Sequence, residues 1–438
     1  MGTSEYFLFL YDHLWLYVSI VISIYILYVL LFRRYCKSLI DPLTLMLFFS
    51  ANAASTPIFL FITSQITVKY FVFFIITQIT FFIGFLIIPP IKVNTCGYEL
   101  EKKEVPTQVI IILFVIITIL NNFTQLLSYY LFEIPIFAES RITVYGESGG
   151  YGQIFNRILN ITYPCSILLT IYFIIKGQGF IKKYALINII VLLIFTVLKG
   201  AKSGFMIFAT SFFIYSMYST RWGNVKFYNN LKKYSLKFLL FASLIAVLVI
   251  LISNPSDNPL FFLLIRLGMS GDIYYMTYPN DIIELIPKSS NWVLNLFSGP
   301  LSSFGFVDRS LVPEPMGFFL SDYHTSGVIT NRGPNARMSA FAYVYIGYFS
   351  SFLYSFFIGF IFSYIRNILF YKLPQNILGC MFYFLLLSFA IKLEPDFHTA
   401  LSDLVNIIFI FLPIVVFTII FSNFLTNAKT SFNNNSNV

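Results

Sequence analysis

The chain has 438 residues, of which 58% are hydrophobic and only 11% are charged. A typical soluble domain contains about 25% charged residues and at most about 50% apolar ones, so a soluble globular protein is excluded. In a soluble domain the formal net charge of +9 would indicate a nucleic-acid partner, but in so apolar a chain it predicts an excess of Lys and Arg on one side of a membrane.

Eleven apolar runs, each bounded by charged residues, Gly or Pro, predict membrane-spanning helices, because about 20 apolar residues cross a bilayer. In chain order they lie near residues 13–32, 39–62, 70–88, 108–132, 153–175, 183–198, 203–220, 236–253, 341–364, 375–391 and 402–422. The sixth and seventh runs are short and meet near Lys199, which favours a tight helical hairpin. The predicted fold class is an all-α polytopic integral membrane protein with 11 or 12 transmembrane helices.

Two long loops and a polar tail complete the predicted organisation. Long loops without regular structure are uncommon unless they are functional, and we expect short helices lying against the membrane in the larger loop, for example at PLFFLLIRLG and NWVLNLF. The predicted parts are helices 1 to 4 over 1–132, an external loop over 133–152, helices 5 to 8 over 153–253, a large external loop over 254–340, helices 9 to 11 over 341–422 and a disordered tail over 423–438.

The basic residues orient this arrangement. If successive spans alternate sides, 17 of the 28 basic residues fall in one set of short loops, which the positive-inside rule makes cytoplasmic. The N-terminus then lies outside and the C-terminus inside. The basic residues left on the external side are Lys69, Arg141, Arg157, Lys199, Lys202, Arg266, Lys288, Arg309, Arg332, Arg337 and Lys392.

These external cations are the main chemical signal, since the sequence contains no Gly-rich phosphate loop, HExxH, GxSxG or Cys/His metal pattern. A nucleotide-driven or zinc-dependent enzyme is therefore disfavoured, and we expect neither a metal nor a cofactor. Arg and Lys are the residues with which proteins hold phosphate, so several of them just outside the membrane would suit a lipid-linked diphosphate. For any single cation, snorkelling or a salt bridge with Glu139, Glu147 or Asp272 is the alternative interpretation.

The layout of about a dozen spans with two arginine-bearing external loops resembles the O-antigen polymerase (Wzy) family. Arg141 is followed after ten residues by Gly152, whereas Arg337 reaches Gly347 after nine and Arg332 has no Gly at that spacing. The segments LKGAKSGFM, RLGMSGDIYY and PNARMSAFAYVYIGYFSSFLYSFFIGF are also similar to segments common in these polymerases, and the resemblance covers about residues 130–365.

The resemblance implies an undecaprenyl-diphosphate-dependent glycosyltransferase at the periplasmic face of the bacterial inner membrane. The growing glycan would leave its undecaprenyl diphosphate for the non-reducing end of a new lipid-linked repeat unit, with no metal required. The expected partners are undecaprenyl-diphosphate-linked glycans, membrane lipid and a chain-length regulator, with no nucleic acid.

The reaction needs cations, a base and a saccharide platform. Preorganised cations would stabilise the departing diphosphate, and the candidates are Arg141, Lys199, Lys202, Arg266, Arg309, Arg332 and Arg337. Asp272, six residues after Arg266, is the expected general base. The alternatives to it are Glu139, Asp322 and His324.

Aromatic side chains could form the platform, although anchoring at the membrane interface explains them equally well. The candidates are Tyr274 and Tyr275, with Tyr278, Trp292 and Tyr323. A second external polar cluster, Glu394, Asp396 and His398 in KLEPDFHTA, is predicted to be a rim or a cap of the site rather than the base.

Two other functions stay open. An O-antigen ligase would share topology and chemistry but would transfer finished polymer to a lipid core. A lipid-linked oligosaccharide flippase or another transporter would make no bond, and would place charges within its spans near the midplane. Charges within the predicted spans are few and near their ends, as with Asp41, Arg157 and Asp403, and the large external loop fits an enzyme better.

Overall fold

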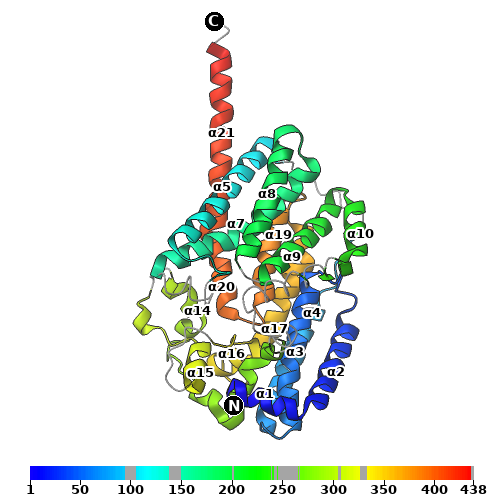
Figure 1. The fold of residues 1–438 in the computed structure, drawn as a ribbon, viewed down its shortest axis with the longest axis vertical. Helices are drawn as coiled ribbons and strands as arrows, with labels where there is room; N and C mark the ends of the chain where they lie inside the picture. Colours follow the sequence, from blue (N-terminus) through cyan, green and yellow to red (C-terminus); the bar gives the residue numbers. More distant parts are fainter. Residues whose placement is uncertain are drawn as a thin grey trace. The chain divides into compact units, whose positions relative to one another are not determined.

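The chain is an all-α polytopic membrane protein, as predicted (Figure 1). The computed structural model describes residues 1–93, 105–137, 149–199, 202–237, 239–240, 244, 265, 267–303, 307–325 and 333–435, and these ranges contain helices and no strands. Within them, eight helices are long and apolar enough to cross a membrane. Six of these are α2 (Leu14–Phe32), α3 (Pro42–Ile62), α4 (Val68–Leu86), α5 (Thr107–Leu131), α7 (Gly149–Lys176) and α8 (Gly179–Leu198).

The other two spans are composite. One covers Ser350–Lys372 and joins α17 (Ser350–Ser363), the π-turn η5 (Tyr364–Ile368) and α18 (Leu369–Lys372). The second begins at Phe397 and joins α20 (Phe397–Asn406), η6 (Ile407–Phe411) and most of α21 (Leu412–Asn435). Of the remaining predicted spans, α9 (Lys202–Ser219) and the shorter α19 (Ile377–Lys392) are helical, and 236–253 falls mostly outside the described residues. The count of eleven stays a prediction.

Two predicted boundaries are wrong. Residues 341–364 do not form one helix, because α16 (Met338–Tyr345) ends before Gly347, whose φ of +93° is the left-handed conformation that terminates helices. The span therefore begins at Ser350. The tail after residue 422 was expected to be disordered, but α21 continues to Asn435, since no Gly or Pro after Pro413 interrupts it.

The chain divides into two compact units. One unit comprises Met1–Lys92, Asn254–Lys372 and Leu386–Ser402, and the other comprises Val93–Ser253, Leu373–Leu385 and Asp403–Val438. In the first unit α2 packs along α3, and α4 packs along α17 (Figure 1). In the second unit α7 packs against α5, α8 and α9, while η1 (Thr220–Trp222) and α10 (Val225–Lys233) follow α9.

Two glycines allow α4 and α17 to cross with their backbones in contact. A Cβ atom added to Gly84 would lie 2.1 Å from the carbonyl oxygen of Phe356, and one added to Gly359 would lie 2.1 Å from that of Phe81. Small residues at such crossings are typical of membrane helices, where close packing rather than the hydrophobic effect drives association.

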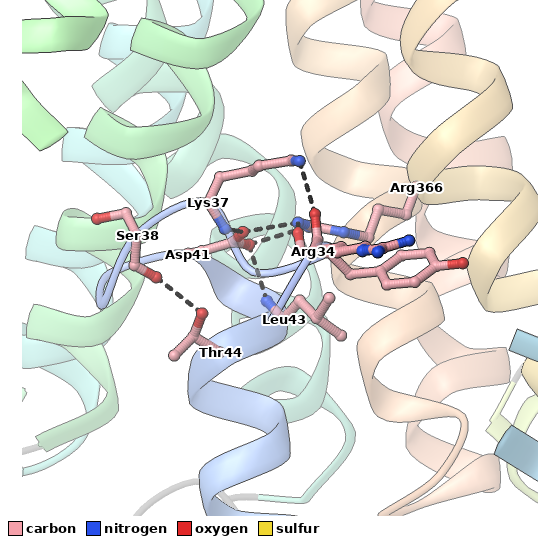
Figure 2. Close-up of polar contacts among 8 residues, drawn as sticks. Arg34, Lys37, Ser38, Asp41, Leu43, Thr44 and Arg366 are labelled. Carbon is pink, nitrogen blue, oxygen red and sulfur yellow. Dashed lines mark hydrogen bonds and ion pairs between the residues drawn. The ribbon is translucent and has the colours of Figure 1, made fainter. Parts of the chain in front are cut away.

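A buried ion pair ties the start of α3 to the π-turn at the end of α17 (Figure 2). Asp41 caps α3 by accepting from the Leu43 amide at 3.0 Å, and its carboxylate receives Nη1 and Nη2 of Arg366 at 2.9 and 2.6 Å. Nη2 also donates to the Tyr35 carbonyl at 3.0 Å, and both charged side chains are fully buried. Arg366 is therefore neutralised within the protein.

The described residues of the large predicted loop form short helices. They are η2 (Met269–Gly271), α13 (Asp272–Thr277), η3 (Pro279–Leu285), α14 (Trp292–Ser303), η4 (Arg309–Leu311), α15 (Met316–Thr325) and α16. The helix expected at NWVLNLF is α14, capped by the Asn291 side chain, which accepts from the Val293 amide at 3.0 Å. Most of PLFFLLIRLG lies outside the described residues. These helices, with α1 (Thr3–Asp12), belong to the first unit and frame the site below.

Candidate functional site

A buried arginine–glutamate pair lies at the centre of the candidate site. Arg337, which precedes α16, donates through Nη1 to both carboxylate oxygens of Glu394 at 2.8 and 3.0 Å. Its Nε donates to the Ser270 carbonyl at 2.8 Å, and the two charged residues are 6% and 2% exposed. Burial alone lowers the pKa of Arg337, but the Glu394 carboxylate raises it above its ordinary value. The guanidinium is thus charged, paired and closed to solvent.

Asp272 begins α13 near this pair. Its Oδ1 accepts a hydrogen bond from the Ile273 amide at 2.9 Å, and its side chain is partly buried. Burial raises the pKa of Asp272 to about 7, against the opposing effect of the Arg337 charge. A carboxyl with this pKa changes charge near neutral pH, which suits the predicted general base.

The two tyrosines expected to contact saccharide are core residues. Tyr274 and Tyr275 are 1% and 0% exposed. The Tyr274 hydroxyl lies 2.9 Å from the Ser339 hydroxyl, and the Tyr275 ring stacks on Tyr6 with centroids 4.0 Å apart. The prediction of an open aromatic platform at these positions is therefore wrong, because tertiary packing covers both rings. Trp292 and Tyr323, at 62% and 50% exposure, keep open faces.

A cavity of about 510 Å³ lies beside the ion pair in the same unit. It is lined by the C-terminal part of α14, residues 312–318, residues 333–336, Tyr345 and the start of α20. The titratable side chains in the lining are Glu314, Asp396 and His398, and none of the described residues lining it is Arg or Lys. The described lining is mildly acidic.

The ion pair fixes two walls of this cavity. Arg337 directly follows the wall segment 333–336, and Glu394 precedes the wall residue Asp396 by two positions. The Glu394 carbonyl also accepts the Met338 amide at 2.7 Å, so the two segments are joined by backbone as well as by charge. Arg337 therefore holds the cavity in shape without lining it.

Asp396 and His398 are held by their own contacts. Asp396 caps α20, accepting from the Thr399 amide at 3.0 Å and from the Thr399 hydroxyl at 2.6 Å. Nε2 of His398 lies 3.0 Å from the Asn295 carbonyl and 3.3 Å from the Ser298 hydroxyl. The sequence predicted a rim for this cluster, whereas the structure places both side chains in the cavity wall. The sequence signal for this cluster was the occurrence of Glu, Asp and His at alternate positions of KLEPDFHTA.

The other predicted residues are dispersed. Nε2 of His324 lies 3.0 Å from the Met276 carbonyl, burial lowers its pKa, and the residue does not line the cavity. Lys199, in the second unit, follows α8 with its ammonium 4.3 Å from the centroid of the Tyr163 ring, and burial lowers its pKa to about 8.

The side chains of six predicted site residues are not among those that the structure describes. Lys202 begins α9 and Arg309 begins η4, but only their backbones are described. Glu139, Arg141, Arg266 and Arg332 lie outside the described residues. Among the residues that are described, no three His, Cys, Asp or Glu side chains lie close enough to hold a metal ion.

Comparisons of the chain with protein-family models, with curated proteins and with solved structures found no match. The site must therefore be interpreted from its own chemistry. It combines a largely apolar cavity, a histidine and two carboxyl groups in the cavity wall, and a buried charge pair that joins the wall segments. Such a site can bind a hydroxyl-bearing ligand and accept a proton from it.

Proposed function

We propose that this membrane protein polymerises undecaprenyl-diphosphate-linked oligosaccharide repeat units by glycosyl transfer at the periplasmic face of a bacterial inner membrane. The observation that carries the proposal is the cavity, about 510 Å³ in volume, whose lining comes mostly from two loops that the sequence predicts on the outside and includes Glu314, Asp396 and His398. Its volume falls within the usual range of small-ligand sites, about 300–1,000 Å³. Its wall residues 334–336 belong to PNARMSAFAY, one of the segments that carry the resemblance to O-antigen polymerases.

The proposed reaction divides its tasks among different residues. Arg337 is a positioning residue, because its guanidinium is already paired with Glu394. The departing diphosphate needs cations that are not neutralised. The candidates in the unit that contains the cavity are Arg266, Arg309 and Arg332.

The proposal is tested with Arg337→Ala in cells that lack the native protein. Loss of Arg337 leaves Glu394 buried and unpaired, so the cavity wall should be displaced and the ladder of long glycans should collapse to single repeat units. Lys69→Ala is the matched control, because Lys69 pairs with Glu284 at 2.9 Å on the surface, with both side chains about half exposed. Protein abundance in the membrane is measured for each variant.

An assay on the purified protein distinguishes a polymerase from a ligase, and a deletion in cells distinguishes either from a flippase. With lipid-linked repeat units as donor and acceptor, the proposal requires longer lipid-linked glycans and released undecaprenyl diphosphate. Consumption of a lipid A core acceptor would instead indicate a ligase. In cells, repeat units accumulating on the inner side of the membrane after deletion would indicate a flippase, and accumulation outside supports the polymerase.

A further inference from the structure

In the His398 ring, Nε2 has hydrogen-bond neighbours within the protein and Nδ1 has none among the described residues. The neighbour of Nε2 at 3.0 Å is the Asn295 carbonyl, which can only accept, so Nε2 carries the hydrogen in this arrangement. None of the hydrogen bonds within the described ranges uses Nδ1. In the neutral ring, Nδ1 is then the basic nitrogen, on a residue that lines the cavity.

The ring is held in place by its surroundings. The Phe341 ring meets it edge to face, with centroids 5.2 Å apart, and Tyr345 packs at 6.3 Å. The Ser298 hydroxyl of α14 lies 3.3 Å from Nε2, where its oxygen can only accept from the N–H of this tautomer. A base whose hydrogen-bearing nitrogen is oriented by a fixed acceptor is preorganised for proton transfer at its other nitrogen.

We propose that His398 is the general base of the transfer reaction and that the cavity is the subsite for the acceptor sugar. This inference rests on the proposed function. Nδ1 takes the proton of the acceptor hydroxyl as that oxygen forms a bond to the anomeric carbon of the donor glycan. The bond from the anomeric carbon to the diphosphate oxygen breaks, and the diphosphate leaves with the electron pair.

The charges of the described lining support this division. Asp396 and Glu314 are the charged side chains there, and an acidic wall disfavours a diphosphate while it tolerates a hydroxyl-rich sugar. Burial of the ring disfavours the imidazolium that proton transfer creates, and the hydrogen bond to the Asn295 carbonyl and the charge of Asp396 oppose this effect. Asp272, the base predicted from the sequence, does not line the cavity.

The test compares His398→Gln with the wild type in a purified assay on lipid-linked repeat units. A glutamine amide can still donate to the Asn295 carbonyl but cannot act as a base. We expect kcat to fall by about 10²–10⁴-fold while KM changes little, and the decline of the wild-type rate at acidic pH to disappear. His13→Gln is the control, since His13 is exposed and its Nδ1 lies 3.1 Å from the Phe9 carbonyl, away from the cavity.

A second variant covers the case in which His398→Gln fails to fold. His398→Ala opens space for added imidazole, which should restore part of the rate. A purely structural role predicts that glutamine keeps activity and that imidazole rescues nothing, and either result would overturn the assignment. Loss of kcat in His324→Gln or Asp272→Asn with normal His398→Gln would move the base to those residues. If the wild type itself makes no longer glycan, the proposed function fails instead.

Discussion

Asp272 couples the stability of the protein to pH. Because its folded-state pKa of about 7 lies above the ordinary value of 3.8, the folded state binds more protons than the unfolded state between these pH values. The free energy of unfolding should therefore fall as pH rises from about 4 to about 7, by a few kcal/mol at most. Asp272→Asn removes this titration and should flatten the pH dependence.

The measurement is the thermal unfolding midpoint of the detergent-solubilised protein between pH 4 and pH 8. The control variant is Asp12→Asn, since Asp12 is exposed near the end of α1. If Asp272→Asn and wild type lose stability in parallel over this window, the raised pKa of Asp272 does not contribute.

The buried pair of Arg337 and Glu394 makes a second prediction about single residues. Glu394→Gln leaves a buried guanidinium without its counter-charge, which should cost about 3–5 kcal/mol in the free energy of unfolding. Glu284→Gln, which breaks the exposed pair with Lys69, should cost less than about 1 kcal/mol. Chemical unfolding in mixed micelles compares the two, and equal losses would contradict the burial argument.

Sequence reasoning found some site residues and missed their relations. It singled out Arg337 as a cation on the predicted external side, where the positive-inside rule disfavours Arg and Lys. It could not show that Glu394, 57 residues later, neutralises this charge. It chose Tyr274 and Tyr275 by residue type, and only tertiary packing reveals that both rings are covered. His398 was noticed with its acidic neighbours, yet the Asn295 carbonyl that orients its ring is 103 residues away.

At the scale of helices, the crossing of α4 and α17 depends on two glycines. Gly359→Ala places a Cβ against the Phe81 carbonyl. Because that carbonyl belongs to the α4 backbone, it cannot move aside unless the two helices separate. We expect a loss of about 1–3 kcal/mol, similar to other overpacked cores. Gly2→Ala is the control, because no atom lies within 4 Å of a Cβ there. Equal unfolding midpoints of the two variants in detergent would contradict the close crossing.

The element boundaries show which signals a sequence carries. Six predicted spans agree with α2, α3, α4, α5, α7 and α8 to within a few residues, because about 20 apolar residues are needed in each and polar residues bound them. The ninth span was misplaced, since hydropathy continues through Gly347 while its backbone turns left-handed. Hydropathy predicts whether a segment lies in lipid or in water, but it does not predict the backbone dihedral angles of that segment.

At the scale of the whole molecule, charge and topology are linked through one internal pair. The positive-inside argument counted Arg366 among the cytoplasmic cations, but Asp41 neutralises it in a fully buried contact (Figure 2). The orientation then rests on the other basic residues of those loops, which still form the majority of the 28 in the chain. Removing Arg366 should therefore affect folding more than orientation.

Orientation is the last prediction, and the proposed reaction depends on it. A fluorescent protein fused after residue 438 should fold and fluoresce, because the C-terminus is expected in the cytoplasm, while alkaline phosphatase fused after residue 303 should be active on the periplasmic side. Fusion of the phosphatase after Lys226, in a predicted cytoplasmic loop, is the negative control. If the fusion after residue 303 is inactive and the one after Lys226 is active, the cavity faces the cytoplasm. Lipid-linked repeat units at the periplasmic face could then not reach His398, and the site would need a cytoplasmic substrate.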